Sequence, residues 1–194
     1  MTDWTDLFDG NSLDGWGVTG NEAGWRVEDE CILCLAERGG YLYTQQQYSD
    51  FELKLDYRTG PGCNSGIFFR WSDLDDPVHT GLEIQILDTH GREQNTHSSG
   101  ALYDMVAPPS DLARPVGEWN ETLLTCVGSR LTFVQNGQQA WDVDIDDWDT
   151  PGQNPDGTAN KFDYAWKEMP KTGHIGLQDH GGRAWFRRIR LRQR

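Results

Sequence analysis

The sequence is poor in positive charge. Its 194 residues contain 17 Lys and Arg against 31 Asp and Glu, a formal net charge of −14 at pH 7. Nucleic acids and anionic membranes are bound through basic surfaces, so this balance argues against both as partners. No apolar run approaches the length that spans a bilayer. These absences favour a soluble protein with a well-solvated surface.

Signatures of cofactor binding and of disulfide or zinc sites are also missing. No Gly-x-Gly-x-x-Gly motif follows a strand and opens a helix, so the sequence predicts no nicotinamide site. Cysteine is scarce, and the residues are Cys31, Cys34, Cys63 and Cys126. The first two have CxxC spacing, but without a second close pair we expect free, buried thiols and no zinc site.

The N-terminal stretch lacks both parts of an export signal. It reads MTDWTDLFDG, with neither a basic segment nor an apolar one. As the chain stands, the sequence favours a cytoplasmic protein, and reduced cysteines agree with that compartment. Removal of a leader would instead make it periplasmic or secreted.

Helix-forming runs are nearly absent, whereas nine Trp, six Tyr, seven Phe and 22 Gly are present. Short segments of alternating apolar and polar residues recur with frequent turn signals, most regularly at residues 51–58. Strands are expected at residues 25–29, 32–36, 41–44, 51–58, 65–71, 81–88, 121–127, 130–135, 138–145, 174–180 and 184–192. An irregular segment is expected at 144–160 and a short helical turn within 162–169. The sequence predicts one all-β domain over residues 1–194, a jelly-roll sandwich of two antiparallel sheets.

Polar side chains gather on one face of three expected strands. In GLEIQILD, residues 81–88, Glu83 and Gln85 alternate with apolar residues and therefore project from the same side of the sheet. Two neighbouring runs show the same arrangement, through Asn64, Gly66 and Arg70 in one and His174, Gln178 and His180 in the other. We therefore expect a polar patch built into one sheet.

Several motifs occur in the order that is typical of one family. They are LFDGNSLDGW, GYLYTQQQYSDFELKLDYR, GPGCNSGIFFR, GLEIQILD, GALYDMVAP, GEWNETLLTCVGSRLTFVQNGQ and GHIGLQDHGGRAWFRRIRLR. Over nearly its whole length the chain resembles the 3-keto-disaccharide hydrolase domain family, which is related to 3-keto-glycoside lyases. The resemblance implies a concanavalin-like jelly roll that cleaves glycosidic bonds of sugars oxidised at C3. Members of this family are often exported, whereas this chain shows no leader.

The chemistry of such a substrate needs only one base. A C3 ketone acidifies the C2 proton, so its removal lets the C1 substituent leave by elimination, and water can then add back to give net hydrolysis. A divalent metal ion or a cationic group would stabilise the intermediate enediolate. We therefore expect at most one divalent metal, no nicotinamide, and a separate sugar 3-oxidoreductase that supplies the keto sugar.

The resemblance assigns roles to the patch residues. His180 is the first candidate for the base or a metal ligand, and Glu83 is its rival for either role. Arg70 would bind hydroxyls or the developing oxyanion. Contacts with the sugar are expected from Asn64, Gln85, Gln178 and Tyr103. The plainer alternatives are that Arg70 forms an ordinary ion pair, with Glu83 as its buried partner, and that His174, His90 and His97 are structural or loop residues.

Two other functions stay open. A conventional glycosidase needs two carboxylates that face one bond, but Glu83 is followed on its face by Gln85 and Leu87. Asp88 and Asp179 have the opposite parity and are expected to cap turns. A non-catalytic carbohydrate-binding module of the same fold would instead stack sugars on exposed aromatic residues, for which the candidates are Trp71, Tyr103 and Trp119.

Overall fold

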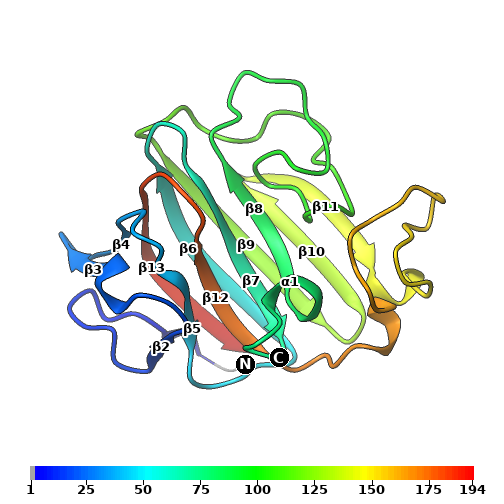
Figure 1. The fold of residues 1–194 in the computed structure, drawn as a ribbon, viewed down its shortest axis with the longest axis horizontal. Coiled ribbons are helices and arrows are strands. Elements are labelled where there is room, and N and C mark those ends of the chain that lie inside the picture. Colours follow the sequence, from blue (N-terminus) through cyan, green and yellow to red (C-terminus); the bar gives the residue numbers. More distant parts are fainter. Residues whose placement is uncertain (1–2) are drawn as a thin grey trace.

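Two antiparallel β-sheets pack face to face in a computed structural model that describes residues 3–194 (Figure 1). The strands of the larger sheet are β1 (Thr5–Asp6), β3 (Trp25–Glu28), β4 (Cys31–Cys34), β6 (Phe51–Thr59), β9 (Trp119–Val127), β10 (Arg130–Gln135), β11 (Gln138–Asp144) and β13 (Ala184–Gln193). Those of the smaller sheet are β2 (Trp16–Val18), β5 (Gly40–Thr44), β7 (Asn64–Trp71), β8 (Leu82–Leu87) and β12 (His174–Asp179).

The order of strands shows that neighbours in space come from distant parts of the chain. The larger sheet runs β11-β10-β9-β6-β13-β4-β3, with β1 also paired to β13, and the smaller sheet runs β2-β5-β12-β7-β8. The prediction of a two-sheet antiparallel jelly roll is therefore confirmed.

Among residues 3–194, helical structure is confined to short turns. They are η1 (Glu22–Gly24), α1 (Pro77–Thr80), η2 (Ile145–Asp147) and η3 (Trp166–Glu168). The helical turn predicted within 162–169 is η3, and η2 lies inside the segment predicted to be irregular. Among the described residues no helix has the length and apolar character needed to cross a membrane.

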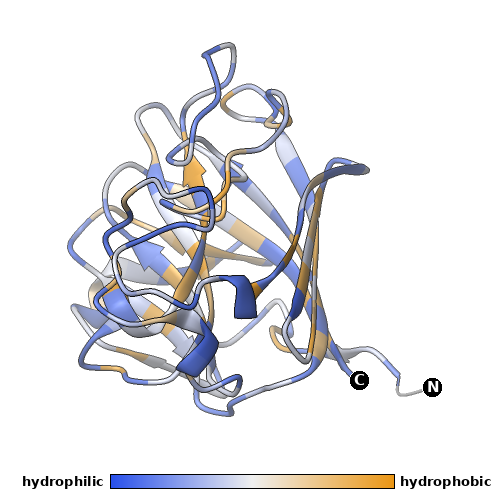
Figure 2. Cartoon of the chain, turned by 90° about the vertical axis from the view of Figure 1, so that its right-hand side faces the viewer, coloured by the Kyte–Doolittle hydropathy of each residue, from blue (hydrophilic) through white to orange (hydrophobic). Residues whose placement is uncertain are grey.

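The core lies between the two sheets and is filled by every second strand residue. On β6 these are Phe51, Leu53, Leu55 and Tyr57, and on β8 they are Leu82, Ile84 and Ile86, all buried. Apolar bands accordingly recur along the strands in Figure 2, whereas the loops are mostly hydrophilic. All four cysteines are buried free thiols, as predicted.

The outer face of β6 is less exposed to solvent than the alternation of its apolar and polar residues predicts. Glu52 and Asp56 are both buried, because arginines of the chain's last strand cover them. Asp56 accepts from Arg187 Nε at 3.1 Å, and Glu52 is bound by Arg192 and Arg194. Ion pairs with arginines thus bury these two carboxylates, although the period-two pattern alone predicts that they are exposed.

Candidate functional site

A pocket of about 350 Å³ lies on the outer face of the smaller sheet. Its lining residues are Tyr41, Asn64, Val78, Glu83, Gln85, Tyr103, Lys161, Gln178, Asp179 and His180. The strands that supply most of them, β5, β12, β7 and β8, lie next to one another in the sheet (Figure 1). Six of the seven predicted site residues therefore meet in one place, and Arg70 is the exception.

The floor of the pocket depends on a glycine at its centre. Gly66 on β7 pairs with Gln85 on β8, and Gln178 on β12 pairs with Tyr41 on β5, so these residues come from four adjacent strands. A Cβ on Gly66 would lie 2.9 Å from Glu83 Cγ, closer than such carbons approach. The missing side chain therefore makes room for the Glu83 carboxyl group.

Glu83 is a buried carboxyl group inside this polar pocket. Only 6% of the residue is exposed. Burial raises its pKa from 4.5 to about 7, because desolvation disfavours the carboxylate, while the positive charge of Lys161 opposes the shift. A group with such a pKa exchanges a proton readily near neutral pH, which is the property of a general base or acid.

A loop segment buries Glu83 by adding to the edge of β8. Gln85 N donates to the Ala101 carbonyl at 3.0 Å, and Gly100 N donates to Gln85 O at 2.8 Å. Tyr103 N donates to the Glu83 carbonyl at 2.9 Å, which fixes the tyrosine beside the carboxyl group. The outer edge of the sheet is thereby paired, and the site gains a wall that strand periodicity cannot reveal.

Side-chain amides form hydrogen bonds with the ionisable groups of the pocket and hold them in position. In the orientation that satisfies both ends of its amide, Gln85 Nε2 donates to Glu83 Oε1 at 3.2 Å and to the Ser65 carbonyl at 3.0 Å. On the exposed rim, His180 Nδ1 lies 3.0 Å from Asn64 Nδ2. Gln178 donates to the Tyr41 hydroxyl at 3.2 Å, and its buried Oε1 has no partner among residues 3–194. That oxygen is an acceptor that a ligand could satisfy.

The placement of Arg70 in the site is wrong. Between Phe68 and Trp71, β7 has one residue more than the facing stretch of β12, and Arg70 there adopts a φ of 49°. This bulge reverses the side on which later residues project. Arg70 is 2% exposed, and its guanidinium lies 3.3 Å from the Ser49 carbonyl and 3.5 Å from Asp50. It is thus ion-paired, but with Asp50 and not with Glu83.

The tryptophans and histidines named as alternative candidates also have structural contacts. Trp71 is fully buried, and Trp119 is covered by Arg187, whose guanidinium carbon lies 3.8 Å from its ring centroid. Neither therefore offers a free face for sugar stacking. His174 is held by Thr44 and Gln47, His90 by Ala113 and Asp111, and His97 by Asp104.

Both aspartates of opposite parity bind turns. Asp88 accepts from Gly62 N at 3.0 Å, as expected for a turn cap. Asp179 lines the pocket but accepts from Gly39 N at 2.6 Å. Its carboxylate is therefore engaged by backbone and differs from Glu83, whose carboxyl group forms no ion pair among the described residues.

Three polar groups of the site were not predicted from the sequence: Lys161, Tyr41 and Asp179, which strand parity places on the opposite face. Lys161 precedes η3 in an irregular segment, where no periodicity relates one side chain to another. Its Nζ lies 4.1 Å from the centroid of the Tyr103 ring. Tyr41 was within a predicted strand, but only the pairing of β5 with β12 brings it beside Gln178.

The side chains of the pocket do not fit a dedicated metal site. Among residues 3–194 no group of three or more His, Cys, Asp or Glu side chains is arranged to hold an ion. The pocket offers two carboxyl groups and one rim imidazole, besides amides and tyrosine hydroxyls. Both carboxyl groups are already hydrogen-bonded, Glu83 to Gln85 and Asp179 to Gly39 N. Protein metal sites commonly use three or more ligands that are free to coordinate, so these residues fit a metal poorly.

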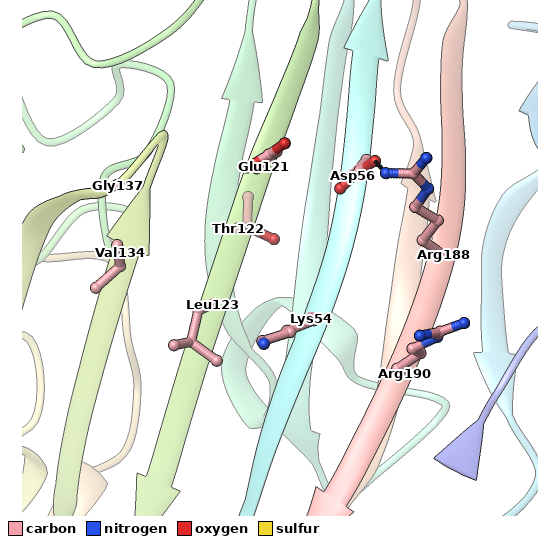
Figure 3. Close-up of a pocket in the computed structure, with 9 residues that line it drawn as sticks. All are labelled: Lys54, Asp56, Glu121, Thr122, Leu123, Val134, Gly137, Arg188 and Arg190. Carbon is pink, nitrogen blue, oxygen red and sulfur yellow. Dashed lines mark ion pairs between the residues drawn. The ribbon is translucent and has the colours of Figure 1, made fainter. Parts of the chain in front are cut away.

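A larger hollow, of about 580 Å³, lies on the outer face of the other sheet (Figure 3). Its central carboxylate, Asp56, faces Arg188 at 3.6 Å and also binds Arg187 at 3.1 Å. This acid is therefore satisfied by neighbouring arginines, and the other carboxyl group of the hollow belongs to the exposed Glu121. The smaller pocket around Glu83 is therefore the candidate active site.

Comparison with known proteins identifies relatives along the whole chain. The model of a family described as 3-keto-alpha-glucoside-1,2-lyase-like domain matches residues 3–192. A 3-keto-disaccharide hydrolase of Bacteroides thetaiotaomicron is 27% identical, over 96% of this chain and 77% of the relative. The crystal structure of a candidate glycosyl hydrolase from Parabacteroides distasonis superposes with a TM-score of 0.90 at 30% identity, covering 99% of this chain and 100% of that one. The carbohydrate-binding module CBM66 of Bacillus subtilis shares the fold, with a TM-score of 0.61 at 16% identity over 92% of this chain and 96% of the module.

Proposed function

The chain belongs to the 3-keto-alpha-glucoside-1,2-lyase-like domain family, and on that premise we propose that it cleaves the glycosidic bond of 3-keto-glycosides. The reaction begins with removal of the C2 proton and proceeds by elimination of the C1 substituent. Addition of water to the unsaturated product gives net hydrolysis. The name of the Bacteroides relative, a 3-keto-disaccharide hydrolase, supports this substrate class.

One observation supports the proposal most strongly, namely a buried Glu83 with a pKa of about 7 in a pocket whose other lining residues are mostly polar. Elimination needs a base whose pKa matches the pH at which it works. A glycosidase acting on an unoxidised sugar needs a second free carboxylate, and the other acid of the pocket, Asp179, is bound to backbone. The site therefore suits a substrate that carries its own activating ketone.

The position of each group suggests its role. Glu83 takes the C2 proton, because it is buried beside the floor where the sugar ring lies. His180 is exposed at the rim and suits proton donation to the departing C1 oxygen. Asn64, Gln85, Gln178 and Tyr103 contribute donors and acceptors for the sugar hydroxyls, and Tyr41 joins them.

A separate sugar 3-oxidoreductase has to supply the substrate. With a hydroxyl group at C3, the C2 proton is too weakly acidic for a carboxylate base to remove. With a ketone there, the electron pair left at C2 is delocalised onto the C3 oxygen. The oxidation state of C3 thus decides whether this pocket can act on the sugar.

The test is turnover of an aryl 3-keto-glucoside, followed by absorbance of the released phenol. We expect release by the wild type and none from the parent glucoside. Glu83→Gln should lower kcat by about 100-fold or more, since loss of a general base typically has that effect, and His180→Ala should lower it less. The wild-type kcat/KM should rise with pH through about 7, because the Glu83 pKa governs its basic form.

Three results would count against this proposal. Sugar binding without product would indicate a binding module, and release from the parent glucoside would indicate a conventional hydrolase. Loss of activity in EDTA, restored by a divalent ion, would show that a metal performs the electrostatic role. Because the donor set fits a metal poorly, we expect activity to survive the chelator.

A further inference from the structure

Within the described part of the chain, Lys161 is the one Lys or Arg side chain that lines the pocket. It comes from the irregular segment before η3 and reaches back over the site, with Nζ 4.1 Å from the centroid of the Tyr103 ring and 5.4 Å from that of Phe162. Tyr103 is itself hydrogen-bonded to the backbone of Glu83. Tyr103 therefore contacts both Lys161 and Glu83.

The backbone of Lys161 is bound independently of its side chain. Asp104 Oδ2 accepts from Lys161 N at 2.7 Å, while Asp104 Oδ1 lies 3.0 Å from His97 Nε2. Asp104 adopts a φ of 62°, so the turn at residue 104 is shaped to present its carboxylate in this position. Substitution of the Lys161 side chain consequently leaves the contact that positions the segment intact.

The ammonium group is partly desolvated and has no direct ionic partner. Within residues 3–194 no carboxylate lies at ion-pair distance from Lys161 Nζ, although the charges of Glu83 and Asp104 act on it. Burial lowers the Lys161 pKa, and those two negative charges oppose the change. A half-buried ammonium group without a bound anion keeps donors that an oxygen of a ligand can occupy.

The proposed reaction creates such an oxygen. When Glu83 takes the C2 proton, the C2–H electron pair forms the C2=C3 double bond, and the C3 oxygen becomes negatively charged. When the C3 ketone re-forms, that pair moves to C1=C2, and the C1 substituent leaves as an alcohol after it receives a proton. The charge on the C3 oxygen is greatest between these steps, so a fixed cation there lowers the barrier.

We propose that Lys161 is a catalytic residue that binds the C3 oxygen of the keto sugar through its ammonium group and stabilises the enediolate. This inference rests on the proposed function. It also assigns to Lys161 the cationic role for which the sequence favoured Arg70, a side chain that lies outside the pocket.

The experiment compares Lys161→Met, which keeps the length and removes the charge, with Lys161→Arg and with Lys167→Met. Lys167 is exposed on η3 and lies outside the pocket, so it is a matched control. On an aryl 3-keto-glucoside, Lys161→Met should lose about 100-fold in kcat with a small change in KM, the effect of removing one oxyanion donor. Lys161→Arg should restore part of the loss, and Lys167→Met should match the wild type.

A second measurement separates charge from folding. Without the positive charge of Lys161 the Glu83 pKa should rise, so the ascending limb of the kcat/KM profile should move to higher pH in Lys161→Met. Methylammonium should partly rescue Lys161→Ala, which a merely misfolded variant would not show. A Lys161→Met enzyme within about threefold of the wild-type kcat, or one whose loss neither amine nor arginine restores, would overturn the inference alone. No turnover by the wild type would overturn the proposed function and this inference together.

Discussion

At the scale of single residues, Glu83 shows how function opposes stability. A carboxyl group whose pKa is raised on folding favours the folded state fully below its unfolded pKa, and that contribution is lost as pH rises through its folded pKa. For Glu83 this window runs from 4.5 to about 7. The protein therefore bears the cost of a buried negative charge at the pH where the carboxylate acts as a base.

This cost predicts a stabilising substitution. Glu83→Gln removes the charge and keeps the shape, so it should raise the melting temperature at pH 8 and have a smaller effect at pH 5. The upper limit is about 3 kcal/mol, which corresponds to a pKa moved from 4.5 to about 7. The measurement is thermal unfolding at both pH values, with the exposed Glu118→Gln as control. Equal increases in melting temperature at the two pH values would mean that the ionised Glu83 carboxylate does not destabilise the folded protein.

At the scale of elements, the central strands of the smaller sheet supply a floor and the loops supply the walls. Gly66 on β7 opens the space that the Glu83 side chain of β8 fills. Segment 100–103 then adds to the edge of β8 and closes the site from the side. The strands thus fix the position of the carboxyl group, while the loops set its desolvation and hence its pKa.

Gly66→Ala tests whether the strands fix the position of the Glu83 carboxyl group. The new Cβ would press on the Glu83 carboxyl group and displace it, so kcat should fall by about tenfold, equivalent to about 1.4 kcal/mol in the barrier. If the methyl group acts only through Glu83, adding it to Glu83→Gln should cause no further loss in a double-mutant cycle. Additive losses in turnover of the aryl 3-keto-glucoside would show that Gly66 matters for another reason, such as packing of β7.

At the scale of the whole molecule, acidic residues outnumber basic ones, and the arginines of the last strand form ion pairs with carboxylates. The arginines of β13 form the densest basic run, but Arg187 is paired with Asp56, Arg190 with Asp6, and Arg192 with Glu52. Arg188 shares Asp56 with Arg187, and Arg194 shares Glu52 with Arg192. The run is therefore only partly neutralised, but it lies in a chain whose net charge is −14. We accordingly expect no binding to DNA or to anionic vesicles at physiological salt.

This expectation is checked by passing the protein over heparin at pH 7 and by sedimenting it with phosphatidylserine vesicles. It should appear in the flow-through of the first and in the supernatant of the second. Retention that Arg187→Gln and Arg192→Gln abolish would show that the run binds polyanions despite its ion pairs and the net negative charge of the chain.

Site residues on regular strands could be placed by strand periodicity, whereas those at a bulge or in a loop could not. Glu83 and Gln85 share a face because the period of a strand is two, and Gln178 and Asn64 could be placed by the same rule. Arg70 could not, because the rule assumes an uninterrupted ladder, and the extra residue in β7 becomes visible only from the pairing with β12. Lys161 and Tyr103 lie in segments without a period, so no local pattern relates them to Glu83.

The sequence by itself determined the two-sheet fold and the polar faces of three strands, because both follow from local alternation of side chains. The tertiary structure decided which groups meet. It excluded Arg70, brought in Lys161 and Tyr41, and buried Glu83 beneath a loop that follows in the chain. Those outcomes depend on strand order, a bulge and the course of loops, which are set by contacts between residues far apart in sequence.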